Sequence, residues 1–305
     1  MPQLNDLSRS LVALDQDSTI IAVVELSQSS WLVAGVLPGI ERQPQKKLEP
    51  SAERLLGPLH RWRDEAVRAG KKMPNGDVLV AEQSAGYLTL LRDDGEGRAK
   101  WIDRHVEDLN RPYGLALRGD EILVADQDAI WRVPHVVGAL RAGRPVPPQK
   151  ADDVPPDQRK PVPGAYGAEL LTKKGVFGIT VGHQNRHLAI DPKNGGLYVG
   201  VGSSGNLGVE PEPKATIQRF DADGSNQTTV ASGTRNPTAL AFHPQTGELW
   251  AVVQERDGLG DNLPSDYLIR VQQGGFYGWP YAYIGKHPQP GHRLPPCRQR
   301  GNRCG

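Results

Sequence analysis

Short apolar segments separated by turn residues dominate the chain from about residue 71 to residue 286. One element recurs there: an apolar segment, a turn, and a strand flanked by small residues. Four stretches carry it, namely Asn75–Glu82 (NGDVLVAE), Arg111–Asp126 (RPYGLALRGDEILVAD), Arg186–Gly202 (RHLAIDPKNGGLYVGVG) and Asn236–Val253 (NPTALAFHPQTGELWAVV). The second strand of each unit follows the previous one after about 43, 76 and 52 residues, which is the spacing of β-propeller blades.

Burial gives this repeat its physical reason. A single small sheet cannot cover both of its faces, whereas sheets packed around an axis cover one another. A β-sandwich is the alternative, and it predicts turns every 8–12 residues without the longer self-similarity. The repeat therefore favours a propeller, and the Pro-rich stretch Arg144–Pro163 is interpreted as a loop between blades.

Residues 1–70 have a different pattern. Thr19–Glu25 (TIIAVVE) and Ser30–Val36 (SWLVAGV) predict two paired strands, and Gln43–Pro50 reads as a polar connection. Ser51 can cap a helix that ends near Gly70. The apolar residues of this helix recur at helical spacing: Leu55, Leu59, Trp62 and Ala66.

Residues 287–305 are Pro-, Gly- and Arg-rich without periodicity, which predicts a disordered basic tail. The sequence thus divides into a strand–strand–helix segment (1–70), a partial β-propeller of about four blades (71–286) and this tail. The expected fold class is mainly β.

Composition narrows the function classes. The net charge of the 305 residues is +1, which argues against a nucleic-acid partner, and 35 Gly with 26 Pro fit many tight turns. The longest apolar run, Ile20–Val24, is too short to span a membrane. The start MPQLNDLSRS lacks the features of a signal peptide, so a cytoplasmic location is expected. Two cysteines, Cys297 and Cys304, provide neither a disulfide framework nor a metal quartet.

Two polar segments precede strands of the repeat. GHQNRHL places His183 and His187 before a strand, where a loop histidine can serve either as a general base or as a turn residue. TRNPTAL offers the planar guanidinium of Arg235 for an anion and the amide of Asn236 as donor and acceptor. The same Asn-Pro pair could instead only redirect the chain.

Two further segments suggest ligand binding. Gln254–Asn262 (QERDGLGDN) supplies carboxylates and loop carbonyls, which suit a hard cation such as Ca²⁺. Its spacing differs from that of a helix–loop–helix calcium site. Gly274–Tyr283 (GGFYGWPYAY) gathers aromatic residues that could line a pocket or belong to the core.

These segments, in this order, resemble the sorbosone dehydrogenase branch of the soluble aldose dehydrogenases. The resemblance extends over roughly Asn75–Lys286 and is carried by LNRPYGLAL, GHQNRHLAI, LYVGVGSSGN, RNPTALAFHPQTGELW, QERDGLGDN and GGFYGWPYAY. It implies a six-bladed quinoprotein propeller that oxidises a sugar or aldehyde with pyrroloquinoline quinone (PQQ) and Ca²⁺. An external electron acceptor would reoxidise the quinone, and members of this family are exported to the periplasm.

The resemblance assigns roles to individual residues. His183 matches the catalytic base, and Arg235 with Asn236 matches the quinone-binding pair. Thr238 stands where the soluble glucose enzymes have a glutamine, so its cofactor contact departs from the family pattern. Asp257 and Gly258 match the positions whose main-chain carbonyls hold calcium.

The N-terminal segment resembles a different family, the insertion-sequence transposases with an RNase H-like DEDD core, and Glu25 falls near their first metal-binding acid. Beyond residue 286 the chain departs from the dehydrogenase pattern. The sequence therefore suggests a composite reading frame with three possible readings: a dehydrogenase impaired by truncation, an inactive propeller fragment, or a transposase-derived fragment acting on DNA. Flanking genomic sequence without transposase or dehydrogenase remnants would contradict this hypothesis.

Overall fold

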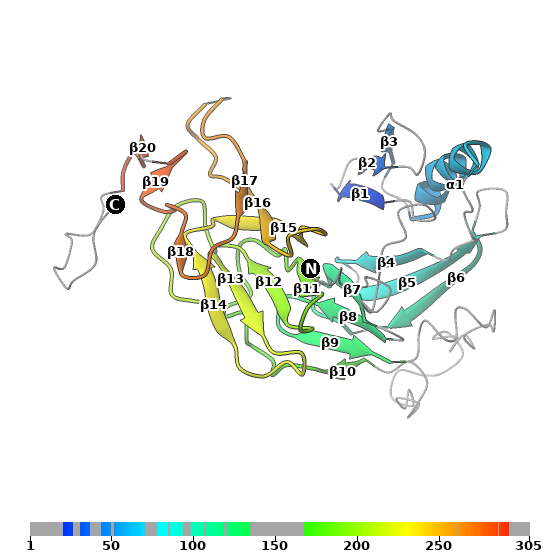
Figure 1. Cartoon of the computed structure of the whole chain (residues 1–305), viewed down its shortest axis with the longest axis horizontal. Helices are drawn as coiled ribbons and strands as arrows, with labels where there is room; N and C mark the ends of the chain where they lie inside the picture. The colour runs from blue at the N-terminus through cyan, green and yellow to red at the C-terminus, as the bar shows by residue number, and fades with distance from the viewer. Residues whose placement is uncertain are drawn as a thin grey trace, which may run out of the picture. The chain divides into compact units, whose positions relative to one another are not determined.

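The computed structural model describes residues 21–26, 31–36, 44–49, 52–70, 78–84, 86–93, 99–106, 108–118, 121–134, 168–260, 262–285 and 287–292. These residues form a mainly β protein with one helix (Figure 1). The chain divides into two compact units. Unit 1 comprises residues 1–109 and 135–167, and unit 2 comprises residues 110–134 and 168–305. The first boundary between the two units follows Leu109.

Unit 1 begins with a three-stranded antiparallel sheet in the order β1-β2-β3. Its strands are β1 (Ile21–Leu26), β2 (Trp31–Val36) and β3 (Gln45–Leu48). The first two are the predicted pair, but β3 corrects the interpretation of this stretch as a connection, since Leu48 pairs with Trp31. The polarity of β3 is misleading because it is an edge strand with exposed lysines, a common feature of sheet edges.

Helix α1 (Ala52–Arg68) confirms the predicted helix. Leu55, Trp62 and Ala66 are buried, as their spacing requires. The helix ends before Gly70, whose φ of 83° is typical of a helix C-terminus, and Gly70 N donates to Val67 O. The predicted cap, Ser51, lies outside the described residues.

The second sheet of unit 1 is an antiparallel meander of three strands. It contains β4 (Val78–Glu82), β5 (Tyr87–Asp93) and β6 (Ala99–Val106). The directly opposed residues Leu88 and Val106 are both buried. Strand β4 lies within the first predicted repeat, Asn75–Glu82.

Unit 2 contains three larger sheets and a terminal hairpin. The first sheet has β7 (Gly114–Arg118), β8 (Glu121–Ala125), β9 (Ile130–Val133) and β10 (Glu169–Leu170). The second has β11 (Leu188–Ile190), β12 (Leu197–Val201), β13 (Thr216–Phe220) and β14 (Thr228–Ser232), with β18 (Gly275–Phe276) at its outer edge. The third has β15 (Asn236–Phe242), β16 (Leu249–Gln254) and β17 (Tyr267–Arg270).

The predicted repeats are the first hairpins of these three sheets. Residues 111–126 contain β7 and β8, residues 186–202 contain β11 and β12, and residues 236–253 contain β15 and β16. The first strand of the middle sheet, β11, contacts both β7 and β15 (Figure 1). Successive meanders whose first strands adjoin form propeller blades, so the predicted partial propeller is confirmed.

Glycines permit this close approach between neighbouring sheets. A Cβ on Gly114 of β7 would lie 2.3 Å from Arg186 O, just before β11. A Cβ on Gly200 of β12 would lie 2.7 Å from Pro237 O of β15. Both separations are too short for a side chain, so glycine lets adjacent main chains touch.

One core cluster of unit 2 lies between the first two of its sheets, and a second, with Ile217 and Leu240, lies between the second and third. The first is built mainly from aliphatic side chains of β8, β11 and β12, including Leu123, Leu188 and Leu197. Phe177 and Phe220 are buried there and pack edge to face, with ring centroids 6.0 Å apart. The described part of the chain has no helix that is both long and apolar enough to cross a membrane.

A short hairpin lies at the predicted start of the tail. β19 (Ala282–Tyr283) pairs with β20 (His287–Pro288), and Gln289 N donates to Tyr281 O at 2.8 Å. Residues 287–292 therefore belong to a hairpin, whereas residues 293–305 and the insertion Arg144–Pro163 lie outside the described residues.

His187 links β11 to β15. Its Nδ1 accepts a hydrogen bond of 3.0 Å from Leu240 N, so this nitrogen must be unprotonated. Burial lowers the pKa of His187 from 6.5 to about 4. The ring therefore stays neutral in the folded protein under conditions in which an unfolded chain would take up a proton.

We predict that unit 2 loses stability as the pH falls from about 6.5 towards 4, with His187 contributing up to about 1.4 kcal/mol per pH unit. The sign follows because the unfolded state binds the proton first. Urea unfolding at several pH values should show a shallower slope for His187→Gln, whose amide oxygen can still accept from Leu240 N. The control His243→Gln, at a half-buried turn position, should keep the wild-type slope, and an unchanged slope in His187→Gln would contradict the assignment.

Candidate active site

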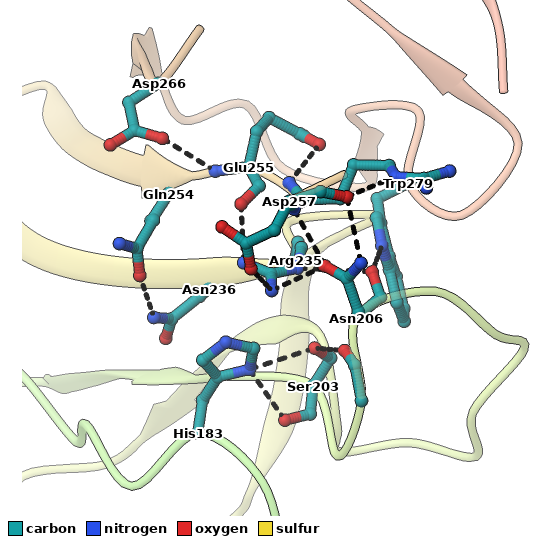
Figure 2. Close-up of polar contacts among 12 residues, drawn as sticks. His183, Ser203, Asn206, Arg235, Asn236, Gln254, Glu255, Asp257, Asp266 and Trp279 are labelled. Atoms are coloured by element: carbon teal, nitrogen blue, oxygen red, sulfur yellow. Dashed lines mark hydrogen bonds and ion pairs between the residues drawn. The ribbon is translucent and has the colours of Figure 1, made fainter. Parts of the chain in front are cut away.

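Polar residues occupy equivalent positions at one end of the three sheets of unit 2. Asn110, His183 and Arg235 precede the first strand of each sheet, and Gln127, Ser203 and Glu255 follow the second. In each sheet the two positions are hydrogen-bonded. Gln127 N donates to Asn110 O at 2.8 Å, His183 N donates to Ser203 O at 3.0 Å, and Arg235 Nη1 donates to Glu255 O at 2.5 Å. The repeat therefore brings the predicted residues His183 and Arg235 to the same end of the fold (Figure 2).

Ser203 fixes the ring of His183. His183 Nδ1 lies 2.9 Å from Ser203 O and 3.0 Å from Ser203 Oγ, and this hydroxyl donates to Gly205 O at 2.6 Å. Since a carbonyl can only accept, Nδ1 carries the proton. The neutral ring then has its lone pair on Nε2, as a general base requires.

The electrostatic surroundings favour this neutral form. Burial lowers the pKa of His183, and the positive charges of Arg235 and Lys214 lower it further. The hydrogen bond to Ser203 and the carboxylate of Glu210 oppose the shift without cancelling it. His183 is thus ready to accept a proton at neutral pH.

Gly202 brings His183 close to Asn236. A Cβ on Gly202 would lie 2.5 Å from His183 Cβ and 2.6 Å from Asn236 Oδ1, so only glycine fits between them. Asn236 is 1% exposed, and its Nδ2 donates to Gln254 Oε1 at 2.9 Å. Its Oδ1 is buried without a hydrogen-bond partner, which marks it as an acceptor available to a ligand hydroxyl.

Arg235 is engaged on all sides. The side chain is 4% exposed, and besides Glu255 O it contacts Asn206 through Nε to O at 3.2 Å and Nη2 to Oδ1 at 2.9 Å. Nη2 also forms an ion pair of 3.3 Å with Asp257 Oδ2, a carboxylate that is 88% exposed. Burial lowers the pKa of Arg235, with Asp257 opposing the shift. The guanidinium therefore holds a fixed position near His183.

Two other buried cations lie close to His183. Lys214 Nζ donates to Val181 O at 3.1 Å, and burial lowers its pKa to about 8. Arg186 is fully buried and donates from Nη1 to His183 O at 3.0 Å, and burial lowers its pKa to about 10. Both donate to main-chain carbonyls, and the carboxylates of Asp126 (on Arg186) and Glu210 (on Lys214) oppose the lowering of their pKa values without cancelling it.

Thr238 has hydrogen-bond contacts of its own on β15. It sits in a β-bulge, because the pairing of β15 with β16 skips from Pro237 to Ala239. Its hydroxyl donates to Val252 O at 3.5 Å, on the neighbouring strand. The prediction that Thr238 contacts the cofactor receives no support from this position.

The main-chain carbonyl of Asp257 does not fit a calcium ion in this structure. It already accepts hydrogen bonds from Asn206 Nδ2 at 3.0 Å and from Arg256 Nε at 3.1 Å. These donors use both lone pairs of the oxygen, and one belongs to a cation. Gly258 follows with a φ of 89° and turns the chain, and a Cβ there would lie 3.9 Å from Arg256 Nη2.

A polar pocket of about 500 Å³ lies within the loop between β16 and β17. It is lined by residues of this loop, among them Glu255, Asp257, Asn262 and Asp266. Glu255 N donates to Asp266 Oδ1 at 2.9 Å, which fixes the start of the loop. Burial raises the pKa of the Glu255 carboxyl.

An anionic quinone fits the charges around His183 better than calcium fits Asp257. Arg186, Lys214 and Arg235 are each no more than 4% exposed, and together they favour a ligand with carboxylates. Asn236 adds its unpartnered acceptor. Of the two predicted cofactors, the described residues thus suit PQQ better than Ca²⁺.

Sequence reasoning missed several residues that build the site. Gly202, Ser203 and Asn206 lie in the segment LYVGVGSSGN, which carries part of the resemblance but received no role. In the aromatic segment, which could line a pocket or belong to the core, Trp279 is buried. It is 2% exposed and donates from Nε1 to Asn206 O at 3.2 Å. The run of small polar residues after β12 was the sequence feature that could have indicated their role in the site.

Comparison with known proteins finds a family match over the stretch of chain that contains most of the site. Residues 180–302 match the glucose/sorbosone dehydrogenase family, and this stretch includes His183, Arg235, Asn236 and Asp257. An uncharacterized protein of Borreliella burgdorferi is 32% identical over 102 residues, which are 33% of this chain and 27% of that protein. The aligned stretch thus spans about a quarter of that relative.

Two solved structures are similar at 15% sequence identity. A glucose dehydrogenase matches with a TM-score of 0.34 over 89% of this chain and 70% of that chain. Regucalcin from Agrobacterium tumefaciens, described as a calcium-binding protein, matches with a TM-score of 0.41 over 83% and 76%. The family match also continues past His287, the predicted start of the tail.

We predict that Gly202→Ala displaces the His183 ring and destabilises unit 2 by about 1–3 kcal/mol, because the new Cβ overlaps His183 and Asn236. Denaturant unfolding and the NMR signals of the histidine rings measure the two effects. Gly208→Ala is the control, since a Cβ there meets nothing within 4 Å. Equal behaviour of the two variants would contradict the close approach.

Proposed function

We propose that unit 2 oxidises a sugar or aldehyde of the sorbosone/aldose class by hydride transfer to PQQ, with His183 as the general base. The observation that carries this proposal is the fixed His183 ring, whose Nδ1 is anchored on Ser203 while Nε2 keeps its lone pair. The match of residues 180–302 to the glucose/sorbosone dehydrogenase family supports the reaction class.

Each residue has a defined task in this proposal. His183 Nε2 takes the proton of the substrate hydroxyl, and the bound quinone would supply the hydride acceptor. Asn236 Oδ1, which has no partner in the protein, accepts a hydrogen bond from the substrate or the cofactor. Arg235, Lys214 and Arg186 provide positive potential for the anionic cofactor and for the negative charge that develops on it.

Calcium is not part of the proposed site at Asp257, because the carbonyl there is already saturated by Asn206 and Arg256. An external electron acceptor would be needed to reoxidise the reduced cofactor. This scheme therefore involves a small-molecule substrate, PQQ and a separate electron acceptor.

Unit 1 receives no activity in this proposal. Strand transfer by an RNase H-like domain needs several carboxylates around metal ions. Within the described parts of the chain, no group of three or more His, Cys, Asp or Glu side chains could hold a metal ion. The transposase-like interpretation stays a prediction about origin, and DNA binding that weakens steeply with salt would be needed to support a function.

We predict that His183→Gln lowers dye-linked sugar oxidation by about 10²–10⁴-fold, the usual contribution of a general base. The assay uses full-length protein loaded with PQQ. Because the pKa of His183 is lowered, wild-type activity should persist below pH 6.5 and fall only when the ring becomes protonated. His243→Gln is the matched control, and undiminished oxidation by His183→Gln would exclude His183 as the base.

We predict that PQQ raises the thermal unfolding temperature of the protein, whereas Ca²⁺ alone does not. A ligand stabilises the state that binds it, and the positive groups around His183 favour an anion. Calorimetry with PQQ, with Ca²⁺ and with both separates these effects. An unfolding temperature that ignores PQQ would favour the inactive-propeller reading, and a shift with Ca²⁺ alone would contradict the assignment at Asp257.

A further inference from the structure

Asn206 is an exposed residue in the loop between β12 and β13, and both its side chain and its main chain form hydrogen bonds. Its carboxamide and carbonyl together bind three separate segments of unit 2 (Figure 2). The partners are Arg235 before β15, Asp257 after β16 and Trp279 after β18. These segments are distant in sequence and meet at this residue.

The carboxamide of Asn206 pairs with the main chain of Asp257 in both directions. Oδ1 accepts from Asp257 N at 2.8 Å, and Nδ2 donates to Asp257 O at 3.0 Å. An amide side chain that uses donor and acceptor on one residue imitates a neighbouring strand. The loop after β16 is thereby fixed at its first exposed residue.

The same residue fixes the plane of the Arg235 guanidinium. Nη2 of Arg235 donates to Asn206 Oδ1 at 2.9 Å, and Nε donates to Asn206 O at 3.2 Å. Two contacts from adjacent nitrogens of a planar group determine both its position and its orientation. Trp279 Nε1 donates to the same carbonyl at 3.2 Å and holds the main chain of Asn206 in place.

We propose that Asn206 is a positioning residue that holds the Arg235 guanidinium beside His183. The effect of Asn206 on catalysis rests on the proposed function. Its effect on the position of Arg235 and on the ionisation of His183 is independent of that function. Without the Asn206 carboxamide, Arg235 Nη2 would keep only its ion pair with the exposed carboxylate of Asp257, and the guanidinium would shift towards it and away from the histidine. The positive potential at His183 would then decrease.

The ionisation of His183 reports the position of Arg235. The charged groups that act on this ring are Arg235, Lys214 and Glu210. Asn206 contacts Arg235 directly, whereas Lys214 donates to Val181 O and Glu210 accepts from Ser204 N and Gly205 N. A change in the His183 pKa after substitution of Asn206 is therefore assigned to Arg235.

The test is an NMR titration of the histidine ring signals in the full chain without cofactor. The chain has eight histidines, and His183→Gln identifies the relevant signal by its loss. Asn206→Ala should raise the pKa of His183, as should Arg235→Gln. The double variant should match Arg235→Gln alone, because Asn206 acts through Arg235. Asn194→Ala, which loses one turn hydrogen bond to Gly196 N, should leave the pKa unchanged.

An unchanged His183 pKa in Asn206→Ala, with the ring signals of a folded protein, would overturn the proposal, as would additive effects in the double variant. Should Asn206→Ala fail to fold, Asn206→Ser serves in its place, since it keeps a polar loop but is too short to reach Arg235. A pKa insensitive to Arg235→Gln as well would also overturn it.

The titration separates this proposal from the proposed function. If the His183 pKa rises but wild-type protein with PQQ oxidises no sugar, the positioning role stands and the dehydrogenase assignment fails. If both hold, Asn206→Ala should lower kcat/KM by roughly 10–100-fold, the effect expected from a misplaced charged group. Asn194→Ala should retain full activity.

Discussion

Direct contact between the main chains of neighbouring sheets is the constraint on which unit 2 depends. Gly114 and Gly200 stand where any side chain would collide with the next sheet, and Gly202 stands between two site residues. This spacing lets His187 of one sheet accept a hydrogen bond from Leu240 of the next. It also lets Ser203 N reach Arg235 O at 2.7 Å. The close main-chain contact at these glycines therefore determines both the packing of the sheets and the geometry of the site.

The site combines a neutral base with buried positive charge. A histidine next to arginine and lysine is kept unprotonated by burial and by like charge, which suits proton abstraction. Arg186 and Lys214 donate to main-chain carbonyls, and Arg235 also pairs with the exposed carboxylate of Asp257. This arrangement is costly for folding without a ligand and favourable once an anion is bound.

The sequence predicted the repeated hairpins but missed features that occur once, such as an edge strand and a β-bulge. The hairpins of all three sheets in unit 2 followed from the spacing of apolar strands, and helix α1 followed from Leu55, Trp62 and Ala66. Strand β3 was missed because an exposed edge strand can be as polar as a loop. The position of Thr238 depended on a bulge, a feature of pairing that strand propensity does not reveal.

The site residues were predicted only as far as they fall at strand ends. His183, Arg235 and Asn236 lie together because the repeat places them so. The role of Asn206 depends on a loop that folds back across three segments, and no local pattern encodes such a contact. The occupied carbonyl of Asp257 likewise follows from neighbours far away in sequence.

The parallel pairing of β14 with β18 has a consequence for how unit 2 opens. Residues Gly275 and Phe276, which follow the third sheet, return to cover the edge of the second. Gly274 N, Tyr277 N and Trp279 N continue this ladder onto Val230, Ser232 and Gly233. These hydrogen bonds join the two sheets into one cooperative segment. Local unfolding of the third sheet would therefore also expose the edge of the second. A cut in the chain just before residue 274 would remove the covalent link between the third sheet and β18, so that β18 could leave and expose the edge of β14.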